Sequence, residues 1–126
     1  MLITGAIMAA LAVMLGAFGA HALQDVLDER ARGWFETAAS YHTQHALALI
    51  ASGLLAGFIP HKRLSAITVA AFCFLTGILF FSGSLYLMAF TGITQLGMVT
   101  PLGGLFFISG WLAFAYAATR LSNRVP

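Results

Sequence analysis

Charge is scarce in this 126-residue sequence. Only 8% of its residues are Asp, Glu, Lys or Arg, whereas 60% are hydrophobic. Because about a quarter of the residues in an average soluble domain are charged, this composition excludes the ordinary water-soluble class. The net charge of +2 comes from six basic residues, which are too few and too scattered to form a nucleic-acid surface. We therefore expect a membrane protein that binds no nucleic acid.

Cysteine is almost absent, and recognisable catalytic motifs are missing. The single Cys73 has no intrachain partner, which excludes an intramolecular disulfide. Because no charged group shares its stretch of sequence, we interpret this thiol as a packing group rather than a nucleophile. The sequence contains no glycine-rich phosphate loop, no triad spacing and no paired carboxylates within an apolar run. These absences predict a protein that is not an enzyme.

What the sequence does contain is long uncharged runs. The ten charges fall into three groups, which leave uncharged stretches of 24, 25 and 56 residues at 1–24, 37–61 and 64–119. Since about 20 apolar residues cross a bilayer core as a helix, the first two stretches hold one span each and the third holds two. We predict an all-α, four-helix transmembrane bundle that forms one integral membrane domain over 1–126. The expected spans are about 2–23, 37–59, 64–90 and 101–119.

Local signals refine these boundaries. Asp28 is a suitable N-cap for a short helix that leads into the second span, and Pro60 ends that span. Thr100 followed by Pro101 resembles an N-cap with proline at the first helical position. In the first span, small residues recur at steps of three and four, a pattern that lets transmembrane helices approach closely. This small-residue seam consists of Gly5, Ala9, Ala12, Gly16 and Gly19.

The basic residues predict the orientation. Four crossings place the N-terminus, the turn after the second span and the C-terminus on one side of the membrane. That side carries four basic residues, and the other side carries two, Arg30 and Arg32. The positive-inside rule therefore favours a plasma-membrane protein with both termini in the cytoplasm.

Polar side chains gather in the half of the bundle near the predicted outer face. Lipid cannot satisfy imidazole, phenol or hydroxyl groups, so we expect these side chains to face the bundle interior. Together they predict a polar half-pocket. Its candidate ligand-binding residues are His21, Tyr41, His45, Ser82, Ser84, Tyr86 and Thr100.

Three interpretations of these residues remain open. The first is structural: His45 forms an interhelical hydrogen bond, for example to Tyr86 or to a serine hydroxyl, that fixes helix register. The second is a pocket for a ligand, ion or proton. The third is a bis-histidine metal or haem site formed by His21 and His45, with His42 as a further ligand. Two histidines without a neighbouring carboxylate or thiolate are a weak metal signal, so we assign no metal site.

Four motifs occur in order along the chain: GAFGAHAL at 16–23, ETAASYHTQHALAL at 36–49, FSGSLYLM at 81–88 and TPLGG at 100–104. Together they resemble a family of small bacterial inner-membrane proteins, the YgdD-like or YwdK-like family. This family is catalogued as domain of unknown function 423 and is related to the eukaryotic transmembrane protein 256. The resemblance implies a four-helix plasma-membrane protein of about this length, and it brings no established activity.

The resemblance also implies which polar positions recur in the family. Besides the seven candidates, it implies Thr37 and Pro101. His42 is a departure, because the family pattern has glutamine there, and this departure weakens any site that requires His42.

Two function hypotheses follow. The leading one is a non-enzymatic accessory or scaffold subunit of a larger membrane assembly, with the lipid bilayer and a membrane-protein partner or second copy as its neighbours. The alternative is a module that binds or transports a small molecule, quinone, ion or haem through the polar half-pocket. The sequence identifies no cofactor.

Overall fold

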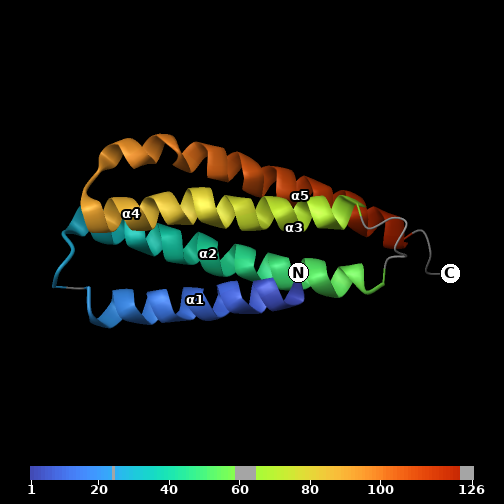
Figure 1. Ribbon diagram of the computed structural model, residues 1–126, viewed down its shortest axis with the longest axis horizontal. Helices are drawn as coiled ribbons and strands as arrows, with labels where there is room; N and C mark the ends of the chain where they lie inside the picture. Colours follow the sequence, from blue (N-terminus) through green and yellow to red (C-terminus); the bar gives the residue numbers. More distant parts are fainter. Residues whose placement is uncertain (24, 59–64, 123–126) are drawn as a thin grey trace.

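The computed structural model describes residues 1–23, 25–58 and 65–122, and over these ranges the chain is helical without strands. It forms a bundle of four helical rods that lie side by side (Figure 1). The first rod is α1 (Leu2–His21) and the second is α2 (Glu29–Ala56). The third consists of α3 (Ser65–Gly77), η2 (Ile78–Ser82) and α4 (Gly83–Thr91) in succession. After the short turn η3 (Thr94–Met98), the fourth rod is α5 (Thr100–Ser122). The predicted all-α, four-helix transmembrane bundle is confirmed.

Three of the four rods are long and apolar enough to cross a membrane by themselves: 2–21, 66–91 and 94–119. The remaining rod, α2, is longer but less apolar because Tyr41, His42, Gln44 and His45 occupy its middle. It is also the rod against which both α1 and the third rod pack. The least apolar helix therefore lies where its polar groups have protein neighbours, as the absence of water in a bilayer requires.

The second rod starts earlier than the predicted span. The expected short helix after Asp28 and the expected span from 37 are one continuous helix, α2. Its N-cap is Asp28, whose carboxylate accepts a hydrogen bond from the Ala31 amide at 2.7 Å. The expected N-cap residue is thus present, but no break follows it. The predicted end of this span at Pro60 lies outside the described residues.

The third rod contains a feature that the sequence analysis did not predict. Between Ile78 and Ser82 the helix widens into one π-helical turn, in which the Gly83 amide bonds to the Ile78 carbonyl five residues earlier. The rod then continues as α4 and ends at Gly92, whose φ of 70° is the left-handed conformation that glycine favours at a helix end. Extra turns of this kind commonly occur near functional sites.

Glycines determine how closely the rods approach. A Cβ added at Gly5 would lie 2.8 Å from the backbone nitrogen of Ile50, and one at Gly53 would lie 2.8 Å from that of Leu2. These two contacts close the α1–α2 interface at one end, as the seam predicts. Gly16 differs from the expectation, because nothing lies within 4 Å of its added Cβ. The seam is therefore tight at Gly5 and again at Gly19, where an added Cβ would clash with the ring of Phe35, and it is open between them at Gly16.

Candidate functional site

His45 is held by contacts from its own helix and from α5. Its Nδ1 lies 2.8 Å from the backbone carbonyl oxygen of Tyr41, and its Nε2 accepts a hydrogen bond from the indole N–H of Trp111 at 3.2 Å. The ring also stacks on Phe107, with ring centres 3.5 Å apart and planes 12° apart. His45 is 3% exposed. It therefore joins α2 to α5 through two hydrogen bonds and a stacked ring.

These partners define the protonation of the ring. A carbonyl oxygen only accepts and an indole N–H only donates, so the His45 proton must be on Nδ1 and Nε2 must be bare. The ring is thus neutral, and both nitrogens are already occupied. This arrangement is the structural interpretation of His45, although its partner is Trp111 and not Tyr86 or a serine. It leaves neither nitrogen free for a ligand.

His21 lies far from His45. It is exposed in the last turn of α1, two residues beyond Gly19, which lies against the ring of Phe35 at the start of α2. Phe35 precedes His45 by ten positions, or about 15 Å along a helix axis. The bis-histidine site of His21 and His45 does not form. Among the described residues there is also no group of three or more His, Cys, Asp or Glu side chains that could hold a metal ion.

The predicted hydroxyl residues lie at the contacts of the third rod. Ser84 donates a hydrogen bond to the Phe81 carbonyl at 2.9 Å, and its Oγ lies 2.7 Å from Oγ1 of Thr100. With the serine proton used in this way, Thr100 is the donor to Ser84, and the pair joins α4 to α5. Tyr41 packs its ring on Phe81, with ring centres 4.6 Å apart. Ser82 is fully buried in the π-helical turn, and its Oγ has no hydrogen-bond partner within the described part of the chain.

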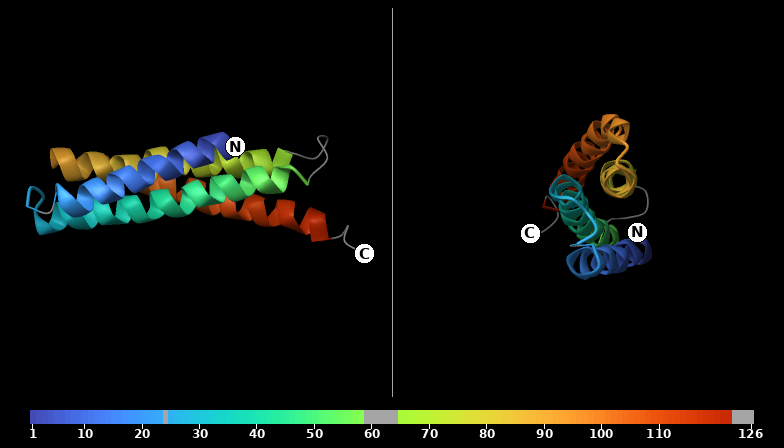
Figure 2. Two further views of the ribbon diagram at one scale, coloured as in Figure 1. Left: turned by 90° about the horizontal axis from the view of Figure 1, so that it is seen from below. Right: turned by 90° about the vertical axis from the view of Figure 1, so that its left-hand side faces the viewer.

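A lateral groove opens on the other side of α2, between α1 and the third rod. Its cavity volume is about 550 Å³. In the end-on view of Figure 2, α1 lies against α2, away from α5. Among the described residues that line it, only His42 and Tyr86 have polar side chains, and the wall covers their polar atoms. Its apolar walls include Leu11, Leu15 and Phe18 of α1 and Ile78, Leu79 and Gly83 of the third rod.

His42 is the polar group of this groove that lacks a partner. The residue is 4% exposed, and its Nε2 is fully covered and makes no hydrogen bond to any described residue. Its Nδ1 lies 3.5 Å from the hydroxyl of Tyr86, at the long limit of a hydrogen bond. The backbone of Met8 lies beside the imidazole without completing a bond to Nε2. A buried polar atom left unsatisfied in this way costs about 1–3 kcal/mol and calls for an explanation.

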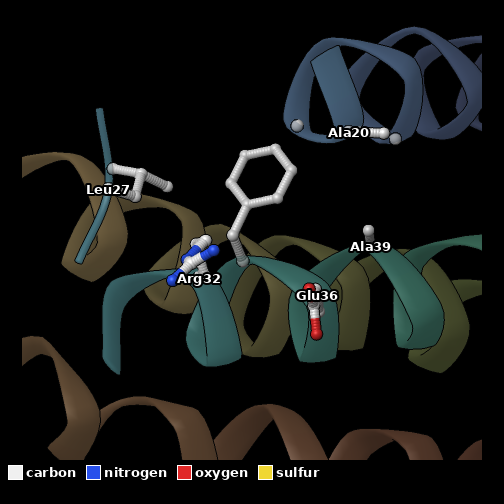
Figure 3. Close-up of a pocket in the computed structure, with 8 residues that line it drawn as sticks. Ala20, Leu27, Arg32, Glu36 and Ala39 are labelled. Carbon is white, nitrogen blue, oxygen red and sulfur yellow. The ribbon is translucent and has the colours of Figure 1, made fainter. Parts of the chain in front are cut away.

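A second, smaller cavity of about 220 Å³ lies near the charged end of the bundle (Figure 3). Gly16, Gly19 and Ala20 of α1 form one side of it, and Arg32 and Glu36 contribute opposite charges from α2. The opening in the small-residue seam at Gly16 thus forms part of this cavity. Both charged side chains are exposed. Glu36, which the sequence places in the first turn of the second span, is therefore a surface carboxylate.

The structure divides the seven predicted residues instead of gathering them in one pocket. Among them, only Tyr86 lines the lateral groove. His45, Ser84 and Thr100 are engaged in contacts that join α5 to the rest of the bundle. The groove residue that the prediction omitted is His42. The signal for it was present, because His42 lies three positions from His45 and shares the buried side of α2, but its departure from the family pattern argued against it.

Comparison with known proteins places the chain among uncharacterised membrane proteins. The family described as "Protein of unknown function (DUF423)" matches residues 15–104. The UPF0382 membrane protein of Staphylococcus epidermidis is 41% identical over 97% of this chain and 97% of its own length. YwdK of Bacillus subtilis is 41% identical over 94% of this chain and 95% of its own.

The inner membrane protein YgdD of Escherichia coli is 37% identical over 98% of this chain and 92% of its own length. No solved structure matches. These matches confirm the family resemblance and the membrane location that the motifs and the composition predict. The chain is a membrane protein that belongs to the DUF423 family.

Proposed function

We propose that this membrane protein is a non-enzymatic binding module that holds a small apolar molecule of the membrane in the lateral groove. The single observation that carries the proposal is the groove itself, a cavity between α1 and the third rod whose lining, among the described residues, is apolar apart from His42 and Tyr86. The groove volume of about 550 Å³ lies within the 300–1,000 Å³ range of small-molecule sites. This is the binding hypothesis that the sequence left open, with the site now placed in the lateral groove beside His42 instead of around His45.

The chemistry of the lining supports binding without catalysis. His42 and Tyr86 are the two polar side chains at the groove, and the rest of the wall is apolar. Binding sites of this kind combine a hydrophobic surface with a few polar groups that orient the ligand. The groove is bounded by α1 on one side and the third rod on the other, so a molecule dissolved in the bilayer enters it sideways.

The experiment fills the groove and measures what remains bound. A Cβ added at Gly83 meets only the Ile78 carbonyl oxygen, at 3.9 Å, so Gly83→Phe projects a ring into the groove without a backbone clash. Leu112→Phe, at a 68% exposed position of α5, is the matched control. Native mass spectrometry after gentle extraction measures any mass beyond the 13.4 kDa chain.

We expect excess mass on the wild-type protein and on Leu112→Phe, and its loss from Gly83→Phe. A bare 13.4 kDa chain in all three samples contradicts the proposal. So does bound mass that Gly83→Phe retains, because the ligand then lies elsewhere.

A second candidate is the accessory or scaffold subunit. The observation that favours it is the opening in the small-residue seam at Gly16, which has no described neighbour within 4 Å of its added Cβ, although α1 packs closely on α2 at Gly5 and at Gly19. A helix of a partner protein fills such a place by close packing. Gly16→Leu is then expected to abolish co-migration with a partner in mild detergent. Migration of the wild-type protein alone at native expression contradicts this candidate.

The orientation completes the proposal. We place both termini in the cytoplasm, on the basis of four basic residues against two on the opposite side. Single cysteines introduced at Ser122 and at Asp25, in a Cys73→Ser background, test it with an impermeant thiol reagent on intact cells. Labelling is expected at position 25 and not at position 122, and the reverse pattern overturns the orientation.

A further inference from the structure

The exposed face of α2 is polar, whereas the exposed faces of α1 and α5 are mostly apolar. An apolar outer face is what a helix that contacts lipid requires. On α2, by contrast, polar side chains are exposed along the first half of the helix, and this rod is the one that is not apolar enough to cross a membrane by itself. The exposed polar residues are Thr37, Ser40, Tyr41, Thr43 and Gln44.

The side chain of Gln44 lies at membrane depth with hydrogen-bonding groups to spare. Gln44 follows Glu36, the last charge at that end of α2, by eight positions, or about 12 Å along the helix axis. Since the hydrocarbon core of a bilayer is about 30 Å thick, this places the amide close to its middle. Gln44 Nε2 donates one hydrogen bond to Ser40 Oγ at 3.3 Å, and among the described residues its other N–H and its carbonyl oxygen have no partner. Lipid cannot supply one.

The exposed face also has the spacing of a helix that pairs with another helix. Its positions alternate steps of four and three along α2, the heptad spacing that keeps one face turned toward a partner over several turns. Nothing described lies within 4 Å of a Cβ added at Gly33, so the face is uncovered at its first position. This heptad face consists of Gly33, Thr37, Ser40, Gln44, Leu47, Ala51 and Leu54, all exposed except the half-buried Ala51.

The heptad face is separate from the lateral groove. Gln44 follows His42 by two positions, which is about 200° around a helix, so the two side chains project from opposite sides of α2. His42 lines the groove, and no residue of the heptad face does. A partner on the heptad face therefore leaves the groove free, and the face calls for a role beyond the proposed function.

We propose that the heptad face pairs with the same face of a second copy of this chain, and that the two Gln44 amides hydrogen-bond to each other. Copies that insert in the same orientation carry each residue at the same depth. A two-fold axis along the membrane normal therefore brings every position of the face opposite itself. Heptad spacing gives such a pair the shallow crossing of about 20° that is common in membrane bundles.

The chemistry of the face selects a second copy over an apolar partner helix. A primary amide is both a donor and an acceptor, so each Gln44 supplies what the other lacks. An apolar helix of another protein would leave the amide as unsatisfied as lipid does. Gly33 and Ser40 are small, which lets the two backbones approach closely enough for the amides to meet.

Disulfide cross-linking in native membranes tests the contact. Single cysteines replace Ser40, Gln44 or Ser109 in a Cys73→Ser background. Ser109 is exposed on α5 and is the matched control for Ser40. With copper phenanthroline as oxidant, we expect a product of twice the chain mass from Ser40→Cys and Gln44→Cys and none from Ser109→Cys. Equal cross-linking at all three positions, none at positions 40 and 44, or a product with a protein of another mass overturns the proposal.

A cysteine away from Gln44 tests the orientation of the pair. Thr37→Cys is expected to cross-link to its own copy, because position 37 meets position 37 in a parallel pair. In an antiparallel pair centred on Gln44, position 37 lies opposite position 51. Cross-links between Thr37→Cys and Ala51→Cys copies, with none within either variant, overturn the parallel arrangement.

Energy transfer between labelled copies measures the strength of the pair. The labels are attached at Ser122→Cys in the Cys73→Ser background, in vesicles of phosphatidylethanolamine and phosphatidylglycerol. Gln44→Leu keeps a side chain of similar size and should raise the dissociation constant of the dimer about tenfold. Ser40→Trp should abolish the dimer, whereas Ser109→Trp should leave it unchanged.

The remaining outcomes separate the dimer from the binding function. A dissociation constant for Gln44→Leu within about threefold of the wild-type value overturns the amide pairing, and an intact dimer in Ser40→Trp overturns the heptad face as the contact. Circular dichroism confirms that each variant keeps its helices. Gly83→Phe fills the groove on the other side of α2 and should dimerise as wild type does. Loss of the dimer in Gly83→Phe places the contact on the groove side and also overturns the proposal.

Discussion

The two sides of α2 differ in how completely their polar groups are paired. His45, on the side of α5, has a hydrogen-bond partner for each ring nitrogen. His42, on the side of α1, is just as buried and leaves Nε2 unpaired. The two residues are three positions apart, an offset of about 60° around a helix. A small rotation around one helix thus separates a closed contact from an open groove.

The cause lies in the neighbouring rods. On the His45 side, Gly103 and Gly110 bring α5 into contact with the backbone of Phe81 and the ring of Phe74. On the His42 side, α1 packs against α2, and the space between α1 and the third rod remains as the groove. Since packing without voids is what stabilises helices in lipid, the first side has a structural role. The second side retains an open groove.

The largest expected effect comes from replacing one glycine on each side by leucine. A Cβ at Gly103 would lie 2.7 Å from Cα of Phe81 and closer still to its backbone nitrogen. Gly103→Leu must therefore push α5 away from the third rod, and we expect little folded protein to accumulate. Gly83→Leu points into the groove and should accumulate as wild type does. Size-exclusion chromatography in detergent measures the yield of folded protein for each variant. Equal yields would contradict the proposed difference between the two sides.

The next effect comes from replacing each histidine by leucine. His45→Leu removes both hydrogen bonds and the stacking on Phe107, and it leaves the Trp111 N–H unpaired. It should lower the free energy of unfolding by about 2 kcal/mol. His42→Leu removes an unpaired Nε2 and only the long 3.5 Å contact between Nδ1 and the Tyr86 hydroxyl, so the expected loss is smaller, about 0.5 kcal/mol. Thermal unfolding in detergent ranks the two variants, and an equal loss from both would show that His42 is also structural.

Whether the sequence predicts a feature of these two sides depends on how far apart in the chain the interacting residues lie. The rods follow from the uncharged stretches, and the N-cap at Asp28 follows from local backbone chemistry. The concentration of polar residues in one half of the bundle also follows from position along each helix. The pairing of His45 with Trp111 spans 66 positions and depends on how α5 is rotated. No pattern in the local sequence predicts how α5 is rotated about its axis.

The same limit explains the residues that the prediction placed differently. The sequence predicts that the polar side chains of α2 face inward. However, the 60° between His42 and His45 is smaller than the width of the inward-facing side of a helix, so the sequence does not separate the two residues. Only the position of α1 decides which imidazole is left unpaired. The π-helical turn at Ile78–Ser82 likewise follows from no pattern of charge or hydrophobic spacing in the sequence.

A smaller effect is expected from removing the hydrogen bond between Trp111 and His45. Trp111→Phe keeps an aromatic ring next to Phe74 and removes the N–H that donates to His45 Nε2. We expect a loss of about 1 kcal/mol in the free energy of unfolding. His45→Phe in the Trp111→Phe background should then cost less than it does alone, because the bond is already absent. Additive losses would mean that the indole and the imidazole stabilise the bundle independently.

The smallest expected effect compares two buried serines of the third rod. Ser84 bonds to Phe81 and Thr100, whereas Ser82 Oγ has no partner. Ser84→Ala should therefore cost about 0.6 kcal/mol, the average for an interhelical hydrogen bond in a membrane protein. Ser82→Ala should be neutral or slightly stabilising, since it removes an unsatisfied hydroxyl. A double-mutant cycle with Thr100→Val isolates the Ser84 contact. If the coupling is zero, close packing around Gly103 holds α5 in place, and the polar pair contributes nothing to closing the His45 side.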